Sequence, residues 1–316
     1  RRNELIFLIM FLLLAVLFIL DLLLGSVHIQ PGEVIRALFG NAGADAETIV
    51  MQFRLPKAIT SLSVGIALSV SGLLMQTLFR NPLAGPYVLG VSSGASLGVA
   101  VVILGLSSGW VSAGLQGLGN WILVAAAWIG AGAVMLLIMA ISVRLREITT
   151  ILILGMMLGS GLSAVVSILQ YFSSESMLKA YVIWTMGSLG NLSSGQLNVL
   201  LISVAAGTVI SIATVKMLNA LLLGENYAGS IGLNIKLSRI LIFSCTSILA
   251  GSVTAFCGPV GFIGIAVPHI ARNVFRTSDH RVLLPGSILA GGIAMIASDI
   301  ISQLPGSESV LPINSI

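Results

Sequence analysis

Few side chains in this sequence have a type and spacing that could carry out chemistry. Two carboxylates, Asp21 and Asp299, fall inside apolar stretches, and each lies near the end of its stretch. A charge at the bilayer centre is costly and usually marks an ion or proton route, and none is evident at that depth. The histidines and cysteines have no partners at metal-ligand spacing, so we interpret them as structural residues: His28, His269, His280, Cys245 and Cys257. The sequence therefore predicts no enzyme, no metal site and no cofactor.

The composition places the chain in a membrane. Its residues are 57% hydrophobic and 8% charged, whereas soluble domains carry roughly 25% charged residues. The apolar segments are long and strand signals are poor, so the fold class is all-α, a polytopic helical membrane protein. No gap between apolar segments can hold a large soluble domain, and residues 1–316 are expected to form a single transmembrane domain. The net charge of +4 is then a topology signal and not a nucleic-acid signal.

The stretch from Arg54 to Leu97 is expected to organise the bundle. Residues 58–79 are apolar without a charge, and this length of helix crosses a hydrocarbon core of about 30 Å. The steps Asn81-Pro82 and Gly85-Pro86 cannot continue that helix, because proline lacks the N–H and disfavours helical backbone at the preceding residue. We therefore predict a sharp turn at a membrane face, followed by a second apolar segment.

Apolar runs predict nine membrane elements. They are residues 5–24, 58–79, 88–106, 121–143, 148–170, 196–217, 238–257, 260–269 and 283–303. The eighth is too short to cross, since ten helical residues cover about 15 Å, and it must pack inside protein or line a water-filled path. Residues 30–40 predict a short amphipathic helix with Pro31 in its first turn. Residues 43–47 are expected to form a polar loop.

The positive charges predict the orientation. With the N-terminus inside, 11 of the 15 Lys and Arg residues lie on the inner side: Arg1, Arg2, Arg80, Arg144, Arg146, Lys216, Lys236, Arg239, Arg272, Arg276 and Arg281. The outer side holds Arg36, Arg54, Lys57 and Lys179. By the positive-inside rule the N-terminus is cytoplasmic, and so is the Asn81-Pro82 turn.

Six segments, in a fixed order, resemble one family. They are RLPK (54–57), SGLLMQTLFRNPLAGPYVLGVSSGASLG (71–98), IWTMGSLGNL (183–192), LLLGENYAGSIGLN (221–234), GPVGFIGIAVPHIAR (258–272) and DHRVLLPGSILAGG (279–292). In these segments the chain resembles the permease subunit of type II ABC importers (FecCD-type), which take up iron–siderophore complexes, haem or vitamin B12. Each segment alone is a weak signal, but six in register are specific.

This resemblance implies a ten-helix permease in the cell (inner) membrane, surrounded by lipid, that performs no chemistry on its cargo. It implies a homodimer with the translocation path on its two-fold axis, and an extracytoplasmic substrate-binding protein. It also implies two ATP-binding cassette ATPase subunits, and this chain has no phosphate-binding loop of its own. An iron–siderophore complex is the preferred substrate, with haem and vitamin B12 as alternatives.

The resemblance assigns the inner gate to Asn81, Leu83, Thr149 and Thr150. On a two-fold axis each of these residues would meet its symmetry copy, so small polar and apolar groups could form closing layers. A turn alone also explains part of the pattern, because Pro82 sets the turn and the Asn81 side chain can bond nearby backbone.

Residues 221–234 are the family's ATPase-coupling helices, which enter a groove on the ATPase. The candidates are Gly224, Glu225, Ala228 and Gly232. A solvated loop with a structural cap is the alternative, since an acidic residue near a helix N-terminus is favoured by the helix dipole alone.

Arg54, Lys57 and Gln303 match the family's outer rim, where basic residues meet acidic residues of the binding protein. Simple snorkelling of the two cations to the headgroups is the alternative. Gln303 departs from the family, which commonly has Arg there, so each rim patch lacks one charge.

Two further points concern the family assignment. The family continues after Leu311-Pro312 into a tenth helix, so we expect the C-terminus, which ends at Ile316, to be truncated or incompletely represented. An ion-coupled secondary transporter is the rival function, and the lack of a mid-membrane carboxylate or of paired broken helices argues against it.

Overall fold

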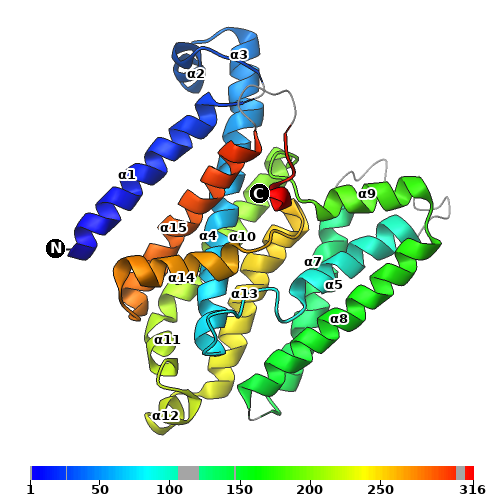
Figure 1. Cartoon of the computed structure of the whole chain (residues 1–316), viewed down its shortest axis with the longest axis vertical. Coiled ribbons are helices and arrows are strands. Elements are labelled where there is room, and N and C mark those ends of the chain that lie inside the picture. The colour runs from blue at the N-terminus through cyan, green and yellow to red at the C-terminus, as the bar shows by residue number, and fades with distance from the viewer. Residues whose placement is uncertain (1, 26, 106–120, 146, 304–309) are drawn as a thin grey trace.

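The computed structural model describes residues 2–25, 27–105, 121–145, 147–303 and 310–316, which form a bundle of helices (Figure 1). In this part of the chain, seven helices are long and apolar enough to cross a membrane. They are α1 (Arg2–Leu23), a continuous segment from Ala44 to Leu78, α7 (Trp121–Ser142), α8 (Ile148–Phe172), α10 (Ser194–Ala213), α13 (Ile235–Cys257) and α15 (His280–Ser302). The described residues contain no strand, so the prediction of an all-α membrane protein is confirmed.

The segment from Ala44 to Leu78 is one long rod. It joins α3 (Ala44–Ile49), the π-helical turn η1 (Val50–Arg54) and α4 (Leu55–Leu78) without a break. The span predicted from residue 58 onward is therefore only the second part of a longer helix. Figure 1 shows the rod running through the middle of the molecule, from dark blue into cyan.

Two local features explain why this rod begins earlier than predicted. The polar loop expected at residues 43–47 is wrong, because acidic Asp45 and Glu47 occupy the first turn of α3, where the helix dipole favours them. Further along, Pro56 does not end the helix. The wide π turn stands directly before it and makes room for a proline ring that would clash with the carbonyl four residues earlier in a regular helix.

α4 is the centre of the bundle. In its apolar window 83% of the residues are buried, compared with 11% in α1. α15, α13, α10 and the short α14 (Ile263–Phe275) pack around it. A Cβ atom at Gly72 would lie 1.7 Å from the Gly264 carbonyl oxygen of α14, so only glycine permits this approach. The prediction that the chain is organised around this stretch is confirmed.

A second group of helices packs beside this centre. α5 (Val91–Ala100) and the π turn η2 (Val101–Gly105) follow the predicted turn after α4 and pack against α7 and α8. Their 15 residues rise about 22 Å, which is less than a full crossing of about 30 Å. Within the described residues, the helix found in the span predicted at 88–106 is thus shorter than that prediction.

The remaining elements are short. α2 (Pro31–Leu38) confirms the predicted amphipathic helix, and α9 (Glu175–Thr185), α11 (Val215–Leu221), α12 (Glu225–Ser230) and η3 (Ile313–Ser315) connect or follow the long helices. α14 was predicted to end by residue 269, but it runs through Pro268 to Phe275. Its 13 residues rise about 20 Å, so it is a part-length element, as predicted. One side of it packs against the bundle, whereas Ile270 and Val274 on another side are 50% and 42% exposed.

The bundle has two ends that matter for function. α2, α3 and the last turns of α1 and α15 lie at the top of Figure 1, which we call the upper end. The turn after α4, the start of α8 and α12 lie at the bottom, which we call the lower end. The residues that the sequence singles out divide between these two ends.

Candidate functional site

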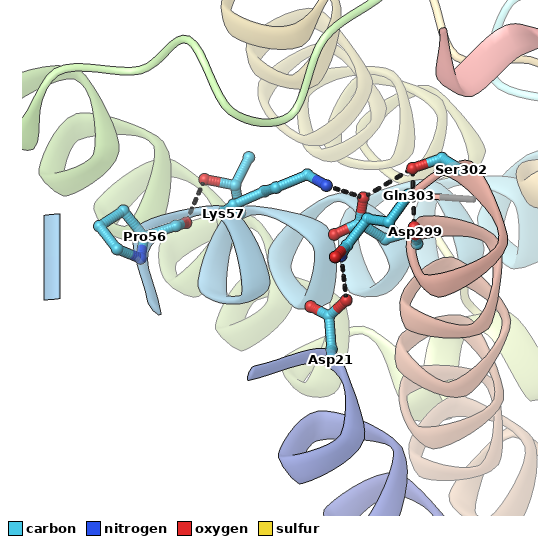
Figure 2. Close-up of polar contacts among 7 residues, drawn as sticks. Asp21, Pro56, Lys57, Asp299, Ser302 and Gln303 are labelled. Carbon is cyan, nitrogen blue, oxygen red and sulfur yellow. Dashed lines mark hydrogen bonds and ion pairs between the residues drawn. The ribbon is translucent and has the colours of Figure 1, made fainter. Parts of the chain in front are cut away.

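At the upper end, a polar cluster joins α1, α4 and α15 (Figure 2). The Lys57 ammonium lies 2.8 Å from Oδ1 of Asp299, which also accepts a bond of 3.1 Å from the Ser302 hydroxyl. The Gln303 amide donates to Oδ1 of Asp21 at 2.8 Å. Asp21, Asp299 and Gln303 are all buried, so the cluster binds the helices to one another.

Arg54 is a neighbour of this cluster in the cavity lining, and its side chain bonds the end of α1. Its guanidinium donates to the carbonyl oxygens of Leu22 at 2.9 Å and Leu23 at 3.0 Å, and also to that of Val27. The last carbonyls of a helix have no partner within the helix, and Arg54 supplies one. The side chain is buried, with 8% exposed.

These three positions are the ones that the sequence assigns to the outer rim. Arg54 and Gln303 are buried, and Lys57 is paired with Asp299. The reason is that carbonyl and carboxylate acceptors from α1 and α15 fold onto the same place. A docking role for the three residues stays a prediction.

The cluster borders a cavity of about 970 Å³ at the upper end. Lys57 and Asp299 line it on one side, and Trp184 and residues 186–191 line it on another. The latter belong to the IWTMGSLGNL segment, for which the sequence suggested no role. The volume lies within the range of small-molecule pockets, about 300–1,000 Å³.

At the lower end, the two turns assigned to the inner gate are separate in this single chain. The Asn81 side chain accepts from the Leu83 amide at 2.9 Å, the self-bonded turn that the sequence allows, and the Leu83 side chain is 71% exposed. Thr149 and Thr150 lie in the first turn of α8, where Thr149 is exposed. Among the described residues no hydrogen bond joins the two turns.

The segment predicted to couple to an ATPase has an inward and an outward face. Glu225 pairs with Arg239 through two bonds, from Nε to Oε1 at 2.8 Å and from Nη2 to Oε2 at 2.6 Å. Ala228, within α12, is fully buried. Gly224 and Gly232 both have positive φ, +100° and +93°, which marks the turns at either end of α12.

The outward face consists of residues that sequence reasoning did not single out. Leu223, Tyr227 and Ile231 are 62%, 53% and 59% exposed. Leu223 precedes α12, Tyr227 lies within it and Ile231 follows it, so the three exposed side chains lie along one short segment. Three large apolar side chains in a segment flanked by Lys216 and Lys236 were a usable signal, but a six-residue helix is too short for its period to be read with certainty from sequence.

His280 is a buried structural residue and not part of a loop. It is the first residue of α15, with Nδ1 at 2.7 Å from Oδ1 of Asn219 and Nε2 at 2.7 Å from the Thr77 hydroxyl. The neighbouring Asp279 caps α15. The Arg281 amide and the Asn219 side chain hold the pKa of the Asp279 carboxyl below its ordinary value.

α8 presents a largely uncovered surface. Only 17% of its apolar window is buried. Three serines on it, Ser160, Ser163 and Ser167, donate to the carbonyl four residues earlier at 2.9 to 3.0 Å. Their hydroxyls are thus satisfied within the helix, and this face offers only weak contacts to whatever covers it.

Comparison with known proteins finds one family over nearly the whole chain. The FecCD transport family matches residues 13–316. The vitamin B12 import system permease protein BtuC of Salmonella typhi is 36% identical over 314 residues, which cover 99% of this chain and 91% of that protein. A protein of Methanocaldococcus jannaschii described as an ABC transporter permease is 35% identical over 301 residues, which cover 92% and 85%. A solved structure described as an inward-facing metal-chelate type ABC transporter has a TM-score of 0.82 at 27% identity, covering 99% and 94%.

Proposed function

Because the chain belongs to the FecCD transport family, we propose that it is the membrane permease of an ATP-driven importer for a large iron chelate or a corrinoid. The observation that carries this proposal is the family match over residues 13–316, together with relatives that transport vitamin B12 or metal chelates. The iron–siderophore complex is our first choice of substrate, with vitamin B12 and haem as the alternatives. The permease moves its cargo and does not alter it.

Transport would use two copies of this chain. The uncovered face of α8, with its internally bonded serines, suits a path through which a bulky chelate passes without sticking. The exposed Leu83 and Thr149 at the lower end would meet their symmetry copies and close that path. Asn81 and Thr150 would complete the same gate.

The ATPase would dock at the lower end, which is cytoplasmic in the orientation that the positive charges favour. Leu223, Tyr227 and Ile231 form an apolar patch there that is large enough to fill a groove. Glu225 and Ala228 would support this patch from below and not touch the ATPase themselves.

The binding protein would dock at the upper end. Lys57 is the docking candidate most open to an acidic side chain, because Arg54 and Gln303, which line the same cavity, are buried. Such a side chain would have to compete with Asp299 for the Lys57 ammonium. Docking would therefore exchange one ion pair for another, and rim charges of this kind act mainly on the association rate.

The test is substrate uptake into proteoliposomes that contain this chain with its ATPase subunits. The cognate binding protein, loaded in turn with radiolabelled ferric siderophore, vitamin B12 or haem, is added outside, with ATP inside. We expect uptake of one of the three that needs both ATP and the binding protein. Uptake driven by a proton or sodium gradient without ATP would instead establish the secondary transporter.

A further inference from the structure

One buried side chain at the lower end connects three separate elements. Arg239, the fifth residue of α13, is 4% exposed. It binds both carboxylate oxygens of Glu225 at the start of α12, and its Nη1 donates to the carbonyl oxygens of Ser142 at 2.9 Å and Leu145 at 2.7 Å. α12, α13 and the end of α7 therefore share one guanidinium.

The chemistry of this contact makes it stiff. A guanidinium is planar, keeps its charge and matches a carboxylate with two parallel bonds. The Ser142 and Leu145 carbonyls stand at the end of α7, where they have no partner within the helix. Pulling Glu225 away would break two charge-assisted hydrogen bonds to a buried guanidinium, which is unfavourable. α12 therefore cannot shift far unless Arg239 and the end of α7 follow it.

The end of α7 leads directly to one of the proposed gate turns. Leu145 precedes Thr149 by four residues, and α8 begins at Ile148, so little chain separates the Arg239 contact from the gate. On its other side α12 reaches the second turn. A Cβ atom at Gly224 would lie 3.2 Å from Nη1 of Arg80, the residue directly before Asn81.

We propose that Arg239 is a positioning residue that transmits a displacement of α12 to the turn carrying Thr149 and Thr150. This inference rests on the proposed function, because it needs an ATPase that moves α12. It assigns to Glu225 a task different from contact with the ATPase. Glu225 holds α12 to Arg239, and we call the contact of Arg239 with Glu225, Ser142 and Leu145 the joint. The apolar patch formed by Leu223, Tyr227 and Ile231 is the surface on which the ATPase acts.

The decisive measurement is the number of substrate molecules imported per ATP hydrolysed. Arg239→Lys keeps the charge but loses the fork, and Glu225→Gln keeps the shape but loses the charge. For both we expect assembly with the ATPase and substantial ATP hydrolysis, with import per ATP reduced by about tenfold, a usual size for coupling between sites. Lys236→Gln, which removes an exposed cation from the same turn of α13, is the control and should keep the wild-type ratio.

A second readout follows the gate itself. Cys245 and Cys257 are buried, so a cysteine placed at the exposed Thr149 is the thiol most open to a charged maleimide among the described residues. In Thr149→Cys the labelling rate should differ between ATP-bound and nucleotide-free complexes. That difference should disappear when Arg239→Lys is added and persist when Lys236→Gln is added.

Three results would overturn the inference. They are a wild-type import ratio in both joint variants, a parallel loss of hydrolysis and import, and a nucleotide-dependent labelling rate that survives Arg239→Lys. If Arg239→Lys does not assemble, Glu225→Gln decides the question. Absence of ATP-driven uptake by the wild-type complex would refute the proposed function instead, so the two failures are distinguishable.

Discussion

Arg54 at the upper end and Arg239 at the lower end share one structural role and differ in a second one. Each donates to carbonyl oxygens left over where a neighbouring helix ends, α1 for Arg54 and α7 for Arg239. Arg54 bonds carbonyl oxygens at and just beyond the end of α1, whereas Arg239 also holds the carboxylate of a short helix at the surface. The comparison indicates that the upper end is a fixed joint, and that the lower end is a joint with one member that can move.

The largest effect should come from leaving a buried charge alone at the fixed joint. Lys57→Met removes the ion-pair partner of Asp299, which is fully buried and has Oδ2 without a hydrogen bond. We expect a loss of about 3–5 kcal/mol of stability, the usual cost of breaking a buried pair. Thermal unfolding in detergent measures it. The double variant Lys57→Met/Asp299→Asn should regain much of the loss, and no recovery would show that Lys57 acts in another way.

A smaller effect separates the two arginines directly. Arg54→Gln removes the donor for the carbonyls at the end of α1 and should cost about 1–3 kcal/mol, the penalty for leaving a buried group unsatisfied. Import per ATP should stay at the wild-type value, because no mobile helix is attached to Arg54. If Arg54→Gln uncouples transport as strongly as Arg239→Lys, the distinction between fixed and mobile joints fails.

The smallest effect on stability should come from the patch outside α12. Tyr227→Ala shortens an exposed side chain, so unfolding should change by no more than about 0.5 kcal/mol. Its affinity for the ATPase subunits should nevertheless fall, because a large aromatic residue leaves the contact. Co-purification at graded ATPase concentrations measures this. Tyr171→Ala, which shortens another exposed tyrosine at the far end of α8, should bind the ATPase normally.

Sequence predicted the membrane elements well because their signal is length. All nine apolar runs contain helix, and α4 is the buried centre. The errors in helix bounds arose at prolines, where the structure around the proline allows the helix to continue. Pro56 reads as a break, but the π turn at Val50–Arg54 absorbs it, and α14 continues through Pro268.

The functional residues were harder to predict because their roles depend on distant chain. Arg54 reads as a rim charge until the end of α1, some thirty residues earlier, is folded against it. From sequence, Glu225 is a candidate docking residue, but in the structure its carboxylate pairs with Arg239. In both cases the side chain's partner, which lies far away in the sequence or in another element, decides which way the side chain faces.

The rod from Ala44 to Leu78 has a consequence for leverage. Its 35 residues rise about 52 Å, whereas the hydrocarbon core is about 30 Å thick. Roughly 20 Å of the rod therefore extends beyond the hydrocarbon, and the rest packs among α13, α14 and α15. A partner that binds the protruding part would press on a continuous helix, with no loop in between to absorb the force. Its natural bending point is the wide turn at Val50–Arg54, where the helix is already unwound.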